Sequence, residues 1–187
     1  MSSAVRWVVV TVVAYVVVGG ILHFPGSLDD VGLEPGPLAF GAVTGLLIGG
    51  AQLFALRGLL AQPWLWPVAT SAGMAITHGT GDGLSPAAGY LPVAIVAGIA
   101  VGVLQAAVLR EPLWAPAAAA GLAIGIFGGY NLAYALGFNS IFDDDALARH
   151  AIMTGLSAIL YALFTAPIFA RIRPENRLPI LASDGAA

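Results

Sequence analysis

Six long apolar windows constrain this chain more than any other feature. They cover roughly residues 5–23, 38–58, 64–79, 89–110, 113–136 and 147–170. A helix that crosses a bilayer needs about 20 mostly apolar residues. Only 9% of the 187 residues are charged, whereas soluble domains carry about 25%. The sequence therefore predicts an all-α integral membrane protein with six transmembrane helices in one domain, residues 1–173, followed by a polar tail, residues 174–187.

A pattern of glycine, glutamine and arginine occurs in two of these windows at the same spacing. The first copy comprises Gly45, Gly49, Gln52 and Arg57, and the second comprises Gly98, Gly102, Gln105 and Arg110. The sixth window keeps only the start of the pattern, at residues 153–155. We therefore expect three tandem helical hairpins, the third degenerate, arranged about an axis along the membrane normal. Their bounds are about 5–58, 63–111 and 112–171.

A tryptophan lies near the start of each odd-numbered window. These residues are Trp7, Trp66 and Trp114, and a small residue follows each of them seven positions later. Tryptophan is enriched where a membrane protein meets the bilayer surface. We therefore expect the three side chains in an interfacial belt on the cytoplasmic side.

The repeated helix, G-x3-G-x2-Q-x4-R with a tryptophan after it, resembles that of functionally unassigned small prokaryotic multi-pass membrane proteins that repeat this hairpin. The resemblance covers about residues 41–121. It implies a hairpin repeat, and it implies no activity and no site residues.

The arginines predict the orientation in the membrane. With six spans, Arg6, Arg57, Arg110 and the three arginines after residue 170 all fall on one side. The positive-inside rule makes that side cytoplasmic. Arg149 lies near the opposite end of the sixth window, where its long side chain can reach the interface. We therefore expect both termini in the cytoplasm of a cell-membrane protein.

Buried polar and small residues in the spans predict how the helices pack. Small residues four apart allow helices to approach closely in lipid, so we expect the paired glycines of both motifs at helix contacts, with a lining role beside a pore or cofactor as the alternative. Gln52 and Gln105 must find partners inside the bundle. We expect them to bond each other or a backbone carbonyl, and a contact to a substrate is the alternative.

Three histidines, His23, His78 and His150, lie near the ends of their windows on the predicted outer side. Histidine is a common ligand of metals and of haem. Two facing imidazoles could hold haem b, and three histidines with Asp82 could hold a metal ion. In the third hairpin Tyr130 and Asn131 take the corresponding polar positions. The alternative is that all these residues are interfacial side chains that bind nothing.

Composition excludes several kinds of chemistry. The chain has no cysteine, and all seven of its basic residues are arginine, so thiol chemistry, disulfides and lysine Schiff bases are excluded. The net charge of −3 gives no basic surface for nucleic acid. We expect a non-enzymatic protein that binds or passes a small ligand through an outward-facing polar cavity. The alternatives are a haem- or metal-binding electron-transfer protein and an accessory subunit of a larger membrane complex. Besides the lipid bilayer, the sequence leaves a homo-oligomer open as a partner.

Overall fold

The computed structural model describes residues 2–22, 36–88, 90–138 and 146–172. These residues form six helices and no strand, so the described part of the chain is all-α, as predicted. The helices are α1 (Ser3–Leu22), α2 (Pro37–Leu56), α3 (Leu65–Ala88), α4 (Tyr90–Leu109), α5 (Trp114–Ala135) and α7 (Ala146–Phe169).

Local sequence explains where α2 begins and ends. Pro37 is the first residue of α2, a position where proline's fixed φ suits the helix and its missing N–H costs nothing. At the other end of α2, Gly58 has a φ of 78°. Glycine adopts this left-handed conformation without steric penalty, so the chain can turn directly into the short connection to α3.

Helix α3 is longer than the sequence predicted. The predicted apolar window ends at residue 79, yet the helix continues through the glycine-rich residues after it to Ala88. Thr77 and Thr80 donate hydrogen bonds to backbone carbonyls one turn earlier. A Cβ on Gly79 would lie 2.6 Å from a methyl group of Leu38, so this glycine allows close contact with α2. Packing against a neighbouring helix therefore outweighs the low helix propensity of glycine.

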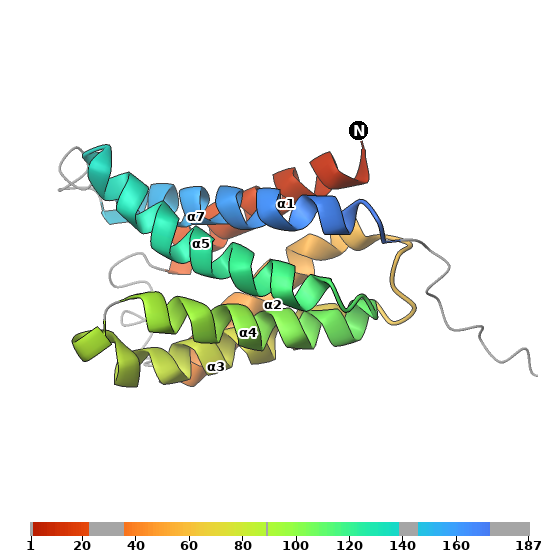
Figure 1. Ribbon diagram of the computed structural model, residues 1–187, viewed down its shortest axis with the longest axis horizontal. Helices are drawn as coiled ribbons and strands as arrows, with labels where there is room; N and C mark the ends of the chain where they lie inside the picture. Colours follow the sequence, from red (N-terminus) through yellow and green to blue (C-terminus); the bar gives the residue numbers. More distant parts are fainter. Residues whose placement is uncertain (1, 23–35, 89, 139–145, 173–187) are drawn as a thin grey trace, which may run out of the picture.

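The helices form a closed ring. Each helix packs against the next along the chain, and α7 packs against α1. Figure 1 shows an elongated bundle whose helices run along its long dimension, with α1 and α7 above α3 and α4 in this view. The ring surrounds a common interior, and residues far apart in the sequence meet there.

Glycines lie where neighbouring helices approach most closely. A Cβ on Gly45 would lie 2.5 Å from the carbonyl oxygen of Thr70, and a Cβ on Gly102 would lie 2.7 Å from that of Ala115. Gly49 and Gly98 likewise face the backbones of α3 and α5. The paired glycines of both motifs thus occupy the contacts of α2 with α3 and of α4 with α5, where a larger side chain would force the backbones apart.

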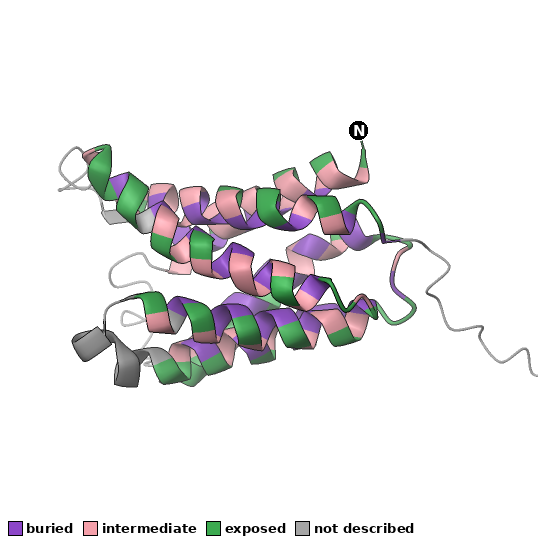
Figure 2. Cartoon of the chain, viewed as in Figure 1, coloured by how far each residue is buried: buried purple, intermediate pink, exposed green. Residues whose placement is uncertain are grey.

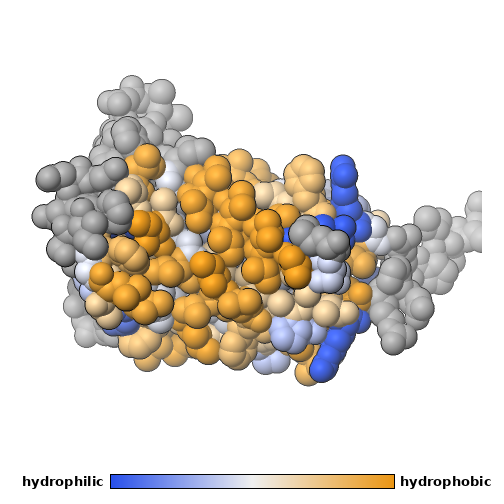
Figure 3. All heavy atoms as spheres, turned by 90° about the horizontal axis from the view of Figure 1, so that it is seen from above, coloured by the Kyte–Doolittle hydropathy of each residue, from blue (hydrophilic) through white to orange (hydrophobic). Residues whose placement is uncertain are grey.

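The outer surface of the bundle is strongly apolar. On α1, Val5, Val9, Val13 and Val17 are all exposed at intervals of one turn. Figure 2 shows buried residues on the inward faces of the helices and exposed residues on the outward faces, and Figure 3 shows hydrophobic residues over the middle of one face. An exposed apolar surface of this extent is compatible with a membrane protein.

Four helical segments are long and apolar enough to cross a membrane. They are Ser3–Gly20, Pro37–Leu56, Trp114–Ala135 and Leu147–Phe169. In α4 the apolar segment Ala94–Leu109 is shorter. Helix α3 is less apolar than the others, because it contains three threonines, two serines and His78.

Candidate functional site

The three tryptophans meet inside the ring. The ring centroid of Trp7 lies 6.0 Å from that of Trp66 and 5.3 Å from that of Trp114, and the latter two are 5.8 Å apart. All three pairs are edge-to-face, a favourable geometry for aromatic rings. Phe169 stacks on Trp7 with a centroid distance of 4.8 Å. We call these four residues the aromatic cluster.

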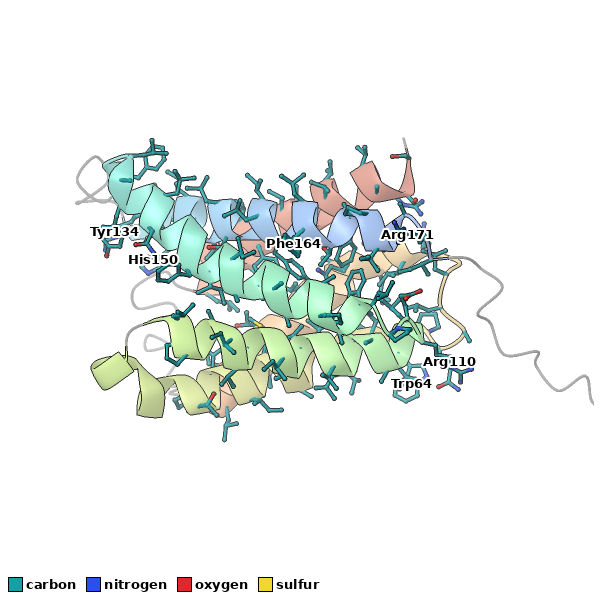
Figure 4. All side chains as sticks on the ribbon, in the orientation of Figure 1. Trp64, Arg110, Tyr134, His150, Phe164 and Arg171 are labelled. Atoms are coloured by element: carbon teal, nitrogen blue, oxygen red, sulfur yellow. The ribbon has the colours of Figure 1, made fainter. Side chains whose placement is uncertain are left out.

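The position of the tryptophans corrects the expectation of an interfacial belt. Trp7, Trp66 and Trp114 are 0% exposed, whereas Trp64 is 61% exposed. Figure 4 shows Trp64 and Arg110 at the same end of the bundle. The reason is hydrogen bonding, because a tryptophan can be buried when its indole N–H finds a partner in the interior.

Each buried indole donates one hydrogen bond to the preceding helix of the ring. Trp66 donates to Oε1 of Gln52 over 3.1 Å, and Trp114 donates to Oε1 of Gln105 over 3.1 Å. Trp7 donates to Oγ1 of Thr165 in α7 over 2.9 Å. The motif glutamines therefore accept hydrogen bonds from the tryptophans that follow them in the chain.

The glutamine amides complete a polar network with hydroxyl groups. Gln52 donates to Oγ1 of Thr11 over 3.2 Å, and Gln105 donates to Oγ1 of Thr70 over 3.0 Å. Tyr161 donates a further bond to Oε1 of Gln105 over 3.2 Å. The glutamines are buried, but their partners are side chains of other helices, not each other or a backbone carbonyl. An amide with several side-chain partners links several helices at once.

The polar network contains only neutral amide and hydroxyl groups. We define it as Gln52, Gln105, Thr11, Thr70, Thr165 and Tyr161. With no charged or strongly nucleophilic group among them, these residues are suited to holding helices together. The hydroxyl partners of the glutamines were not predicted from the sequence. A signal was present, because a threonine follows both Trp7 and Trp66 four residues later, one helical turn away.

The described histidines lie at the end of the bundle opposite the aromatic cluster. His78, in α3, is half-buried and packs edge-on against Phe40, with 5.1 Å between the ring centroids. His150, in α7, is also half-buried, and Figure 4 shows it at the end opposite Arg110 and Arg171. Helices α3 and α7 are not neighbours in the ring. The two histidines thus share an end of the bundle but not a helix contact.

The remaining candidate residues are only partly described. Asn131 is exposed and donates a hydrogen bond to the carbonyl of Phe127, one turn earlier in α5. His23 and the side chains of Asp82 and Tyr130 lie outside the described residues. Among the described residues there is no group of three histidine, cysteine, aspartate or glutamate side chains that could hold a metal ion. The metal and haem hypotheses therefore stay predictions.

Thr44 has an unsatisfied hydroxyl in the bundle. Its side chain is 4% exposed, and its buried Oγ1 has no hydrogen-bond partner among the described residues. Thr70 and Thr165, in contrast, each donate to a carbonyl four residues earlier. Thr44 precedes Gln52 by eight residues, or about 12 Å along the helix axis. It therefore lies between the polar network and the histidine end.

No protein-family model, curated protein or solved structure matches this chain.

Proposed function

We propose that this chain is a non-enzymatic, six-span membrane protein that binds or passes a small ligand through a polar cavity at the histidine end of the bundle. The observation that carries the proposal is the buried hydroxyl of Thr44, which has no hydrogen-bond partner in the part of the chain that the structure describes. Buried polar atoms are nearly always hydrogen-bonded, and an exception calls for an unseen water or ligand.

The aromatic cluster supports one closed end. The interior where α1, α3 and α5 begin is filled by Trp7, Trp66 and Trp114. Their indole N–H groups are occupied by hydrogen bonds. A ligand entering from the histidine end would be stopped by these packed tryptophans. Binding of the ligand requires no movement of these residues, whereas passage of the ligand through the bundle requires the three indoles to separate.

The contacts of the motif residues support the three-hairpin repeat. The bond from Trp66 to Gln52 recurs as the bond from Trp114 to Gln105, and each glutamine donates to a threonine of its own hairpin. In the third hairpin Thr165 accepts from Trp7 in place of a glutamine. The repeat accounts for six spans, because α3 and α4 would form the second hairpin even though α3 is less apolar.

The arginines support cytoplasmic termini. Arg6 lies near the start of α1, and Arg57 and Arg110 follow the ends of α2 and α4. Figure 4 shows Arg110 and Arg171 at the end where the chain begins, opposite His150. Positive residues favour the cytoplasmic side, so the proposed cavity opens outward.

Cysteine accessibility tests the proposed cavity. The chain has no native cysteine, so a single Thr44→Cys variant carries the only thiol. We expect it to react with a small, water-soluble methanethiosulfonate reagent in purified protein. Ile48→Cys, one turn further along α2 and packed with Ala14 and Val18, is the matched control and should not react. An inert Thr44→Cys in folded protein would contradict the cavity.

A further inference from the structure

The corner between α1 and α2, at the end opposite the histidines, carries two arginines that have no acidic partner among the described residues. Arg6 donates from Nη2 to the carbonyl oxygen of Ala55 over 3.0 Å, and this bond brings it to the end of α2. Arg57 lies two residues after Ala55 and is exposed. Two guanidinium groups thus lie at one corner of the ring.

The hydrogen-bonding capacity of Arg6 is largely unused. Its Nε is buried and has no partner, and Nη2 is its one nitrogen with a partner among the described residues. An unsatisfied buried donor is costly, so an added acceptor that reoriented the guanidinium would be favourable. Among the described side chains Glu111 is the one carboxylate, and it accepts from the backbone of Leu113 in the turn after α4.

Each arginine lies at the end of an exposed apolar helix face, Arg6 on α1 and Arg57 beside that of α2. Val9 and Val13 follow Arg6 by three and seven residues, and both are about half exposed. Phe54 precedes Arg57 by three residues, is 62% exposed, and has the guanidinium carbon of Arg57 5.4 Å from its ring centroid. Spacings of three and seven residues place side chains on one helical face.

Gly50 leaves part of the α2 face bare. It precedes Arg57 by seven residues, and a Cβ built on it would meet nothing within 4 Å. The motif glycines, in contrast, contact neighbouring backbones. Glycine inside a helix costs stability relative to alanine, and Gly50 has no packing role in the bundle that would offset that cost. It leaves room for an external apolar chain.

We propose that an anionic phospholipid binds at the α1–α2 corner, with its phosphate between Arg6 and Arg57 and an acyl chain along the face bared by Gly50. Arginine suits phosphate because its planar fork can donate two parallel hydrogen bonds. The lipid occupies the end of the bundle opposite the proposed ligand cavity. Of the proposed function, this inference depends only on the membrane location and not on the cavity.

The second hairpin has a counterpart of Arg57 but lacks the other parts of this site. Where the repeat has Arg6 before Trp7, the next hairpin has Leu65 before Trp66. Val103 takes the position of Gly50 and is exposed, and Ala107 takes that of Phe54. Arg110 is the counterpart of Arg57 without the other parts, so it is a control within the same molecule.

Lipid titration of delipidated protein in mild detergent tests the site. The probes are dioleoyl phosphatidylglycerol, dioleoyl phosphatidylcholine and inorganic phosphate, and native mass spectrometry measures the bound fraction. We expect the anionic lipid to bind at least about fivefold more tightly than the zwitterionic lipid. Inorganic phosphate should not compete, because it has no acyl chain. Equal binding of both lipids, or competition by inorganic phosphate at millimolar concentration, would overturn the proposal.

Variants separate this corner from general surface charge. Arg57→Gln and Arg6→Gln should each weaken phosphatidylglycerol binding by about fivefold, and Gly50→Leu should weaken it by blocking the chain. Arg110→Gln should leave binding within about twofold. If Arg6→Gln does not fold, Arg57→Gln and Gly50→Leu still decide the question. An equal loss in Arg110→Gln and Arg57→Gln, or no loss in Gly50→Leu, would contradict the assigned position.

Discussion

Trp114 donates its indole N–H to Oε1 of Gln105 over 3.1 Å, and this bond joins the start of α5 to the last turns of α4. The same oxygen also accepts from the hydroxyl of Tyr161 in α7. One side-chain amide therefore connects three helices, and its Nε2 reaches a fourth through Thr70. Gln52 connects fewer, because among the described residues its Oε1 accepts from Trp66 alone.

The two glutamines should therefore differ in their effect on stability. Gln105→Leu leaves two buried donors unsatisfied, whereas Gln52→Leu leaves one. We expect the free energy of unfolding to fall by about 2–4 kcal/mol for Gln105→Leu and by about 1–2 kcal/mol for Gln52→Leu. Reversible unfolding in detergent measures both. A larger loss for Gln52→Leu would mean that the bond from Tyr161 contributes nothing.

Adjacent glycines in α2 should respond oppositely to a larger side chain. A Cβ on Gly49 would lie 2.8 Å from Cα of Pro67, whereas one on Gly50 would meet nothing within 4 Å. Gly49→Leu, like Gly102→Leu in α4, should lower the free energy of unfolding by about 1–3 kcal/mol through overpacking. Gly50→Leu should be neutral or slightly stabilising. Thermal unfolding compares the three, and similar behaviour of Gly49→Leu and Gly50→Leu would contradict the α2–α3 contact.

The orientation can be measured in intact cells with an impermeant thiol reagent. A single cysteine at Ser27 should be labelled, because the connection between the first two predicted spans is expected on the outer side of the membrane. A cysteine at Ser183, in the predicted cytoplasmic tail, should be protected until the cells are opened. The reverse pattern would invert the topology, and the proposed cavity would then face the cytoplasm.

Absorption spectra and metal analysis separate the proposed function from the cofactor alternative. Protein expressed with haem and metals available should be colourless and metal-free if the bundle binds a small ligand without a cofactor. The cofactor alternative instead predicts a Soret band or bound metal that is lost in His23→Ala, His78→Ala or His150→Ala. A Soret band that disappears with one of these substitutions would replace our proposal.

The sequence by itself was enough to locate the helices. Apolar windows of about 20 residues identified all six, and five of them begin and end within a few residues of the observed bounds. This works because membrane-spanning length and hydrophobicity are local properties of the chain. The exception is α3, whose glycine-rich end at Gly79 remains helical because Leu38 of α2 packs against it.

The interior was decided by the tertiary structure alone. Tryptophan at a helix end is as typical of a lipid interface as of a buried cluster, and nothing local in the sequence distinguishes the two. The choice depends on whether the indole N–H finds an acceptor, and for Trp7 that acceptor is Thr165, 158 residues away in the chain. Closure of the ring by α7 against α1 brings the two together. A partner that remote is set by how the helices assemble, and no pattern within one helix contains that information.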